Sequence, residues 1–207
     1  MKNYPAIALI EFNDLAHGIT AGDAMVKKAP ILMLKAGTIS RGKYLVLIGG
    51  STASVKESYS EGLMVGGDGV IDSVFLPDVH EQVHEALLGT RRPVDWESLG
   101  ILETGTVASI IQAADAGIKG ARVNIVEMRL GDGYGGKGYV LFTGTVEEVQ
   151  AAMDIGLAVI QDRHIEIFSQ IIPSLHAHLT AAIQSNLRFS QSKKLHLPDG
   201  EDSHETG

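Results

Sequence analysis

The sequence predicts an α/β protein of the α+β, ferredoxin-like class, made of two copies of one small domain in tandem. The first observation behind this prediction is an internal repeat. The segment AIALIEFNDLAHGITAGDAMVKKA, from residue 6, aligns with SLGILETGTVASIIQAADAGIKGA, from residue 98, at a constant offset of 92. After one shift of two residues the match continues with Lys43 over Lys137, and after a second such shift with His80 over His176. Matches in one order over about 85 residues favour a duplication over two unrelated halves.

The second observation is the order of elements, which is strand, helix, strand, strand, helix, strand, helix in both copies. Short apolar runs predict the strands, and apolar residues three or four apart predict the helices. In the first copy we expect strands at 6–12, 30–36, 43–49 and 70–76, and helices at 20–29, after Gly50 and from Pro77. In the second copy we expect strands at 99–104, 123–130, 137–143 and 165–172, and helices at 109–121, after Gly144 and from Pro173. This order is that of a split β-α-β fold with a trailing helix.

Local signals indicate where the helices begin. Ser109 with Gln112, and Thr145 with Glu148, have the spacing of a capping box. The proline after each last strand is expected to open the short helix, because proline is favoured at a first helical position.

The chain is expected to divide into a first domain, 1–90, a second domain, 91–185, and a tail, 186–207. The join LLGTRRPVDWE is short and polar, so the two copies should lie side by side with little freedom. Apolar periodicity ends near Asn186, and the polar tail is expected to be disordered.

Composition excludes several classes of function. Asp and Glu outnumber Lys and Arg by 25 to 17, and no basic cluster is present, so nucleic acid is not an expected partner. No apolar run approaches the roughly 18 residues of a membrane span, and the first residues lack the apolar core of a signal peptide. We therefore expect no membrane association and a cytoplasmic location. Without cysteine the chain cannot hold a thiolate-ligated iron-sulfur cluster, and we expect no cofactor and no metal.

The residues that repeat also carry a family resemblance. In the second copy they are ILET, AADAGIKGA, GYGGK, TGTVEEV and IIPSLH, and in the first LIEF, DAMVKKA, SRGK and LPDVH. Together they resemble the bacterial microcompartment domain over residues 6 to about 185. The resemblance implies a structural shell protein: a homotrimer of two-domain chains that forms a pseudohexameric, unpermuted, single-layer tile. The tile would be similar to the shell trimers of propanediol-type compartments.

The same resemblance implies the partners and location of the protein. Other shell proteins would meet it edge to edge, encapsulated enzymes would be further partners, and small metabolites would pass through a central pore. The chain would lie in the shell of a microcompartment in the cytoplasm.

The resemblance places two glycine-bearing loops around that pore, namely Ser40, Arg41 and Gly42 in the first copy and Asp132, Gly133, Tyr134 and Gly135 in the second. Glycine lets backbones approach the axis and adopt positive φ. Some relatives carry a cysteine at the position of Ser40 for an iron-sulfur cluster, and serine excludes that cluster here. We hypothesise a small polar opening whose selectivity is set by Ser40, Arg41 and Asp132. The loop GDGYGG could instead suggest phosphate binding, but it lies between two strands and lacks a helix N-terminus.

Four residues are expected at the edge of the tile. Lys27 and Lys119 match the family's edge lysine, whose stem lies across the seam while its ammonium group reaches carbonyl oxygens opposite. The alternative is a pair of ordinary solvated helix lysines. His80 and His176 match further edge positions, and for them a buried or capping role is favoured over a metal site.

Catalysis finds little support in the sequence. Glu11 and Glu103 lie inside apolar strands and could act as general acid and base, but their repetition favours structural carboxylates that hydrogen-bond locally. The usual hydrolase, zinc-protease and Walker patterns are missing. The sequence therefore predicts a non-enzyme. A second hypothesis is a ferredoxin-like trimeric regulatory protein that binds an effector between subunits.

Overall fold

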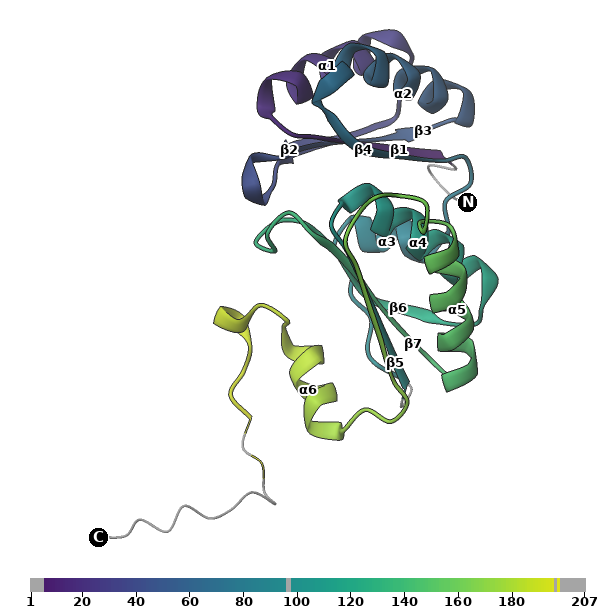
Figure 1. Ribbon diagram of the computed structural model, residues 1–207, viewed down its shortest axis with the longest axis vertical. Coiled ribbons are helices and arrows are strands. Elements are labelled where there is room, and N and C mark those ends of the chain that lie inside the picture. The colour runs from purple at the N-terminus through teal and green to yellow at the C-terminus, as the bar shows by residue number, and fades with distance from the viewer. Residues whose placement is uncertain (1–5, 96–97, 196, 198–207) are drawn as a thin grey trace, which may run out of the picture.

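Two antiparallel sheets, each covered by helices, make up the computed structural model, which describes residues 6–95, 98–195 and 197 (Figure 1). The strand order is β2-β3-β1-β4 in one sheet and β6-β7-β5-β8 in the other. The two sheets share one topology, so the duplication and the ferredoxin-like class are confirmed.

The elements follow the predicted order in both copies. The first domain contains β1 (Ala6–Phe12), α1 (Leu15–Lys28), β2 (Met33–Thr38), η1 (Ser40–Gly42), β3 (Tyr44–Gly50), α2 (Thr52–Gly66), η2 (Gly67–Gly69), β4 (Val70–Leu76) and α3 (Glu81–Leu87). The second contains β5 (Ser98–Thr104), α4 (Val107–Gly120), β6 (Asn124–Leu130), β7 (Gly138–Gly144), α5 (Val146–Ala158), β8 (Ile167–Ile172) and α6 (Ala177–Ser185). The 3-10 turn η3 (Phe189–Gln191) follows.

Side-chain caps decide where several helices begin. The Asp14 carboxylate accepts a hydrogen bond from the His17 amide at 2.9 Å, so α1 begins at Leu15 rather than near residue 20. Thr145 accepts from the Glu148 amide at 3.4 Å, as the capping-box spacing predicts. The Glu148 carboxylate does not complete the box, because it accepts from the Arg122 amide at 2.6 Å.

Two predicted helix starts are wrong. Ser109 does not cap α4, which begins after Thr106, and it is instead fully buried inside that helix. The prolines after β4 and β8 do not open the short helices. Each of these helices begins after a histidine, His80 or His176, whose ring Nδ1 accepts an amide two residues on, at 3.2 and 3.3 Å. The favoured capping role of the histidines is therefore confirmed.

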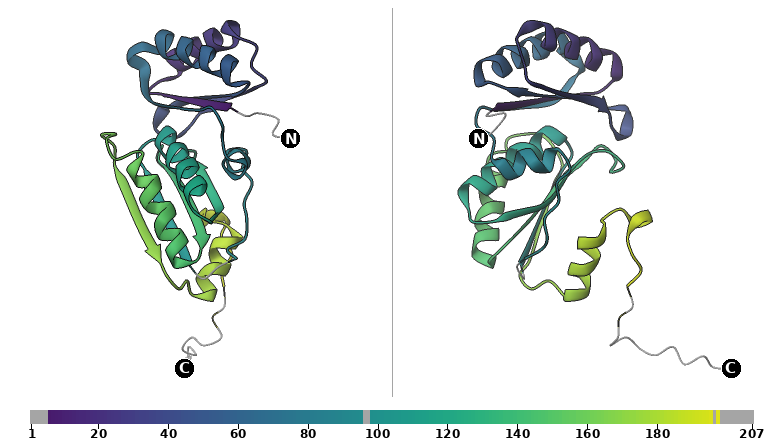
Figure 2. Two further views of the ribbon diagram at one scale, coloured as in Figure 1. Left: turned by 90° about the vertical axis from the view of Figure 1, so that its right-hand side faces the viewer. Right: turned by 180° about the vertical axis from the view of Figure 1, so that it is seen from behind.

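Both faces of β1 are buried, and they face different parts of the chain. On the inner face, Ile10 and Phe12 pack against α1 and α2 in the core of the first domain. On the outer face, Ile7 and Leu9 belong to one apolar cluster with Ile111 of α4. Figure 1 and Figure 2 show α4 directly against the first sheet. The core of the second domain is thus continuous with the outer face of the first sheet.

The chain beyond α6 runs along the far end of the second domain (Figure 2). Arg91, in the join between the domains, donates a hydrogen bond to the Ile183 carbonyl of α6 at 2.7 Å. Within 186–195 the chain forms η3, which the sequence analysis did not anticipate. The remainder of the tail, residue 196 and residues 198–207, lies outside the described residues. No helix among the residues that the structure describes is long and apolar enough to cross a membrane.

Candidate functional site

A buried ion pair joins the two domains. Glu11 is fully buried, and its carboxylate receives the Lys43 ammonium group at 2.6 Å and the Val107 amide at 2.7 Å. Lys43 also donates to the carbonyls of Gly105 and Gly136, at 3.2 and 3.0 Å. Every one of these bonds except the Glu11–Lys43 pair crosses from the first domain to the second, so the pair holds the start of α4 against the first sheet.

Burial dominates the electrostatics of Glu11. It raises the pKa of the carboxyl, and the hydrogen bond and charge of Lys43 oppose it without cancelling it. The Glu11 carboxylate binds one cation and two backbone amides, so it has a structural role, as predicted.

A second polar cluster closes the same interface beside β4. The Asp72 carboxylate accepts hydrogen bonds from Thr106 and from Ser109, the latter at 2.6 Å. Arg163, from the turn after α5, pairs with Asp72 and also donates to Gln112. The burial of Ser109 inside α4 is explained by this cluster.

The two predicted pore loops lie side by side. The Gly133 amide donates to the Ser40 hydroxyl at 3.0 Å, so the hydroxyl is engaged within the chain. Arg41 adopts a left-handed φ of 69°, and it is exposed, as is Asp132. Gly42, Gly133 and Gly135 also have positive φ and are exposed, which explains the glycines in both loops.

Tyr134 of the second loop turns toward the sheet, where its hydroxyl donates to the Glu103 carboxylate. Lys137 donates to the same carboxylate at 3.0 Å. Burial works to raise the pKa of Glu103, but these two hydrogen bonds outweigh it and lower the pKa below its ordinary value. The Tyr134 hydroxyl responds in the opposite sense: burial and the neighbouring carboxylate raise its pKa to about 12.

The structure brings two of the four predicted edge residues together. Lys119 pairs with Asp115 at 2.6 Å and donates to the carbonyl of Asp78, while the His80 amide donates to Asp115 at 2.8 Å. The turn before α3 is thereby fastened to α4. Among the residues that the structure describes, Lys27 forms the matching pair with Asp23, at 2.5 Å, and its side chain is 73% exposed.

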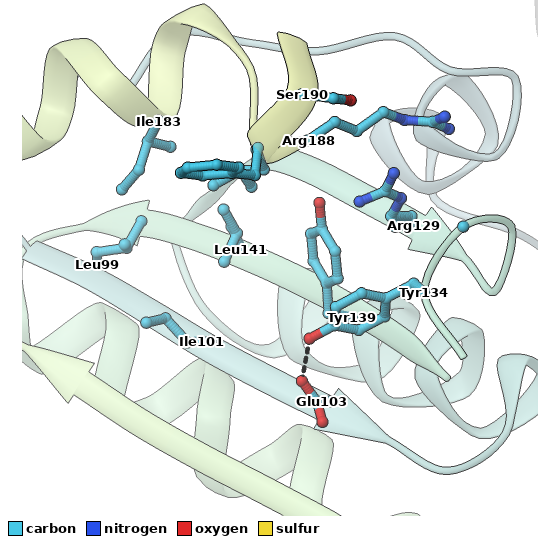
Figure 3. A pocket seen from close by; sticks show the side chains of 13 residues that line it. Leu99, Ile101, Glu103, Arg129, Tyr134, Tyr139, Leu141, Ile183, Arg188 and Ser190 are labelled. Carbon is cyan, nitrogen blue, oxygen red and sulfur yellow. Dashed lines mark hydrogen bonds between the residues drawn. The ribbon is translucent and has the colours of Figure 1, made fainter. Parts of the chain in front are cut away.

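A cavity of about 780 Å³ lies between the outer face of the second sheet and the segment after α6 (Figure 3). The cavity has no sequence signature, because its walls come from distant segments that show no motif. It is lined by Leu99, Ile101, Glu103, Arg129, Gly133, Tyr134, Tyr139, Leu141, Ile183, Leu187, Arg188, Phe189 and Ser190. Among the described residues, no group of three or more histidine or carboxylate side chains is placed to hold a metal ion.

The geometry thus defines a duplicated α+β protein. Its two domains pack through α4 and the first sheet, and the glycine-bearing loops of both domains lie side by side. Comparison with known proteins identifies the class. The BMC domain model matches residues 6–79 and again 98–175, so the chain belongs to the BMC domain family, with two such domains in tandem. It is a bacterial microcompartment shell protein.

Individual relatives agree with this assignment. The chain is 33% identical over 171 residues to the bacterial microcompartment shell protein PduT of Citrobacter freundii, covering 83% of this chain and 93% of PduT. It is 32% identical over 97 residues to the shell protein EutM of Escherichia coli K12, over 46% of this chain.

Solved structures show the same architecture. A crystal structure of a microcompartment protein from Desulfitobacterium hafniense is 40% identical and superposes with a TM-score of 0.73, over 84% of this chain and 97% of that one. The fused permuted hexameric shell protein MSM0275 is 27% identical, with a TM-score of 0.53, over 74% of this chain and 82% of that one.

Proposed function

We propose that three copies of this chain close into a ring of six domains, a structural tile with a pore on its axis. One observation carries the proposal. The two domains of one chain meet through helix α4 and the outer face of the first sheet, and the matching surfaces, helix α1 and the outer face of the second sheet, are exposed.

Helices α1 and α4 show this most directly. Three apolar residues of α4, namely Val107, Ile111 and Ile118, are at most 6% exposed. Their counterparts in α1, at the offset of 92, are Leu15, Ile19 and Val26, which are 45–52% exposed. Helix α1 therefore presents an apolar stripe that lacks the neighbour α4 has.

The complementary surface lies on the second sheet. Phe168 of β8 occupies the position that Asp72 holds in β4, where Asp72 receives side chains of α4. Phe168 is 55% exposed. One chain cannot bring its own α1 to this face, because its two domains already pack against each other through α4 and the first sheet, but a second copy can. A contact of this heterologous kind, repeated from copy to copy, closes into a ring or continues as a filament.

Similarity to hexameric and single-domain shell proteins favours the ring. The solved relative MSM0275 is described as a fused hexameric shell protein, and EutM matches about one domain of this chain. Six domains in a ring correspond to three copies of a two-domain chain. The polar contacts support the same arrangement, since Asp23 is placed to accept from the His176 amide of a neighbour as Asp115 accepts from the His80 amide.

The pore follows from the same arrangement. The loops at 40–42 and 131–136 lie together within one chain, so three copies would alternate the two loops around the axis. Arg41 and Asp132 are exposed there, whereas the Ser40 hydroxyl is held by Gly133. We expect a polar opening for small metabolites whose charge is set by Arg41 and Asp132, and a structural rather than catalytic role for the tile.

Sedimentation equilibrium tests the ring. Ile19→Asp places a charge in the middle of the exposed α1 stripe and should convert the trimer into a folded monomer. Met64→Asp is the matched control, because Met64 is 70% exposed on α2, away from this stripe. A trimer that persists in Ile19→Asp, or a wild-type chain that sediments as a monomer, would overturn the proposal.

Electron microscopy of assembled sheets tests the edge role of the lysines. Lys27→Ala should leave the trimer intact and weaken sheet formation, and the double variant with Lys119→Ala should weaken it further. Lys56→Ala, an exposed lysine of α2, serves as the control. Sheets that form without any ligand also separate a tile from a regulatory trimer, which would stay dispersed. Unchanged sheets in the double variant would remove the edge role and leave the trimer standing.

A further inference from the structure

The cavity on the second domain has an apolar interior. Leu99, Ile101 and Leu141 form its floor on the outer face of β5 and β7, and Ile183 and Leu187 close it from the side of α6. The rings of Tyr134 and Tyr139 meet edge to face with centroids 5.1 Å apart at one end. A volume of about 780 Å³ is in the range that holds a small organic molecule.

Two cationic groups converge at the mouth of this cavity. A methyl group built on Gly133 would lie 3.7 Å from Nη2 of Arg129 and 3.9 Å from Nη1 of Arg188, so both guanidinium groups surround one point. Figure 3 shows both side chains at the same end of the cavity as the tyrosines. Within residues 6–95, 98–195 and 197, neither guanidinium group forms an ion pair with a carboxylate.

The carboxylates beside the cavity already have cations of their own. Glu103 is held by Lys137 at 3.0 Å. Glu127 is held by Arg91 at 2.5 Å and by the Tyr139 hydroxyl at 2.6 Å. Two positive charges therefore remain at the mouth, in a chain whose formal net charge is -8.

We propose that this cavity binds a small organic anion with an apolar, preferably aromatic, body. The anionic group lies between Arg129 and Arg188, where guanidinium groups donate paired hydrogen bonds. The apolar body lies over Tyr139 and Leu141. Every residue of the site belongs to one chain, and the proposal rests on the trimer leaving this part of the second sheet open.

The first domain supplies a natural comparison. Its corresponding cavity is about 240 Å³ and is lined by Leu9, Leu45 and Leu47, with Gly37 at the position of Arg129 and Lys35 two residues before it on β2. Asp132 also lines it. One lysine opposed by a carboxylate, with leucine in place of Tyr139, does not favour an aromatic anion. That cavity nevertheless stays open although the second domain packs beside it, so we expect the larger one to stay open when a second copy packs there.

Titration with 8-anilinonaphthalene-1-sulfonate tests the proposal, because this probe joins an aromatic body to a sulfonate and fluoresces in apolar surroundings. We expect one site per chain. Arg188→Gln and Arg129→Gln should each weaken binding about tenfold, the loss expected for one charge-assisted hydrogen bond. Lys35→Gln, in the smaller cavity, should leave binding unchanged. The uncharged probe N-phenyl-1-naphthylamine should bind all four proteins alike.

Three results would overturn the proposal: unchanged sulfonate binding in Arg188→Gln, an equal loss in Lys35→Gln, or an equal loss of the uncharged probe. Arg188 is exposed and lies beyond the last helix, so its substitution leaves the core intact, as circular dichroism would verify. Sedimentation of the same variants separates failure of this site from failure of the trimer.

Discussion

The two domains share a topology, yet matching residues have different surroundings, because only the first sheet has its outer face covered by the other domain. Glu11 is fully buried, whereas Glu103 at the matching position is 20% exposed. Ile111 of α4 is fully buried, whereas Ile19 of α1 is 52% exposed. The difference supports the proposal that the domain interface is one half of a repeated contact, in which the exposed copies of these residues would meet a second chain.

The largest expected difference between the domains comes from substituting the matched isoleucines, Ile111 and Ile19. Ile111→Asp buries an unpaired carboxylate and should destabilise the fold by about 4 kcal/mol or more. Ile19→Asp should change the free energy of unfolding of the monomer by less than about 0.5 kcal/mol, because its side chain reaches water. Urea denaturation, at a chain concentration low enough for the wild type to be a monomer, measures both losses. Similar losses would contradict the division into a filled and an unfilled contact.

The second test removes the matched lysines, in the monomeric Ile19→Asp background. Lys43→Met leaves the buried Glu11 carboxylate without a cation and should cost about 3–5 kcal/mol. Lys137→Met should cost about 1 kcal/mol or less, since Glu103 keeps the Tyr134 hydroxyl and contact with water. Urea denaturation at neutral pH gives both values, and equal costs would count against the comparison.

The smallest expected effect concerns the pH dependence of stability, to which Glu11 and Glu103 contribute with opposite signs. The folded pKa of Glu11 is above its ordinary value of 4.5, so its contribution to stability falls as pH rises from 4.5 through the folded pKa. The folded pKa of Glu103 is below 4.5, so its contribution is present above 4.5 and is lost as pH falls through the folded pKa.

Glu11→Gln should therefore flatten the fall in stability above pH 4.5, and Glu103→Gln should flatten the loss below it. Unfolding free energies measured across this range, again in the monomeric background, give the two slopes. If both substitutions changed the dependence of the unfolding free energy on pH in the same direction, the two carboxyls would have equivalent surroundings.

Much of the fold could be predicted from the sequence because apolar periodicity is local. The strand at Val70–Leu76 was predicted with its observed bounds. The start of α1 was missed because Asp14, not an apolar residue, sets it. Ser109 looked like a cap in the sequence, but its hydroxyl bonds Asp72, which is 37 positions away along the chain. The proposed roles of the pore and edge residues remain predictions.

The sequence by itself determined the duplication, the order of elements, the family and the absence of thiolate chemistry, because each depends on residue identity and local spacing. Only the tertiary structure decided which copy of each repeated residue is covered, that the Ser40 hydroxyl is held by Gly133, and that Arg129 and Arg188 meet. The physical reason is that burial and charge pairing depend on which distant segments lie together, and a repeat, by giving both copies the same residues, conceals that difference.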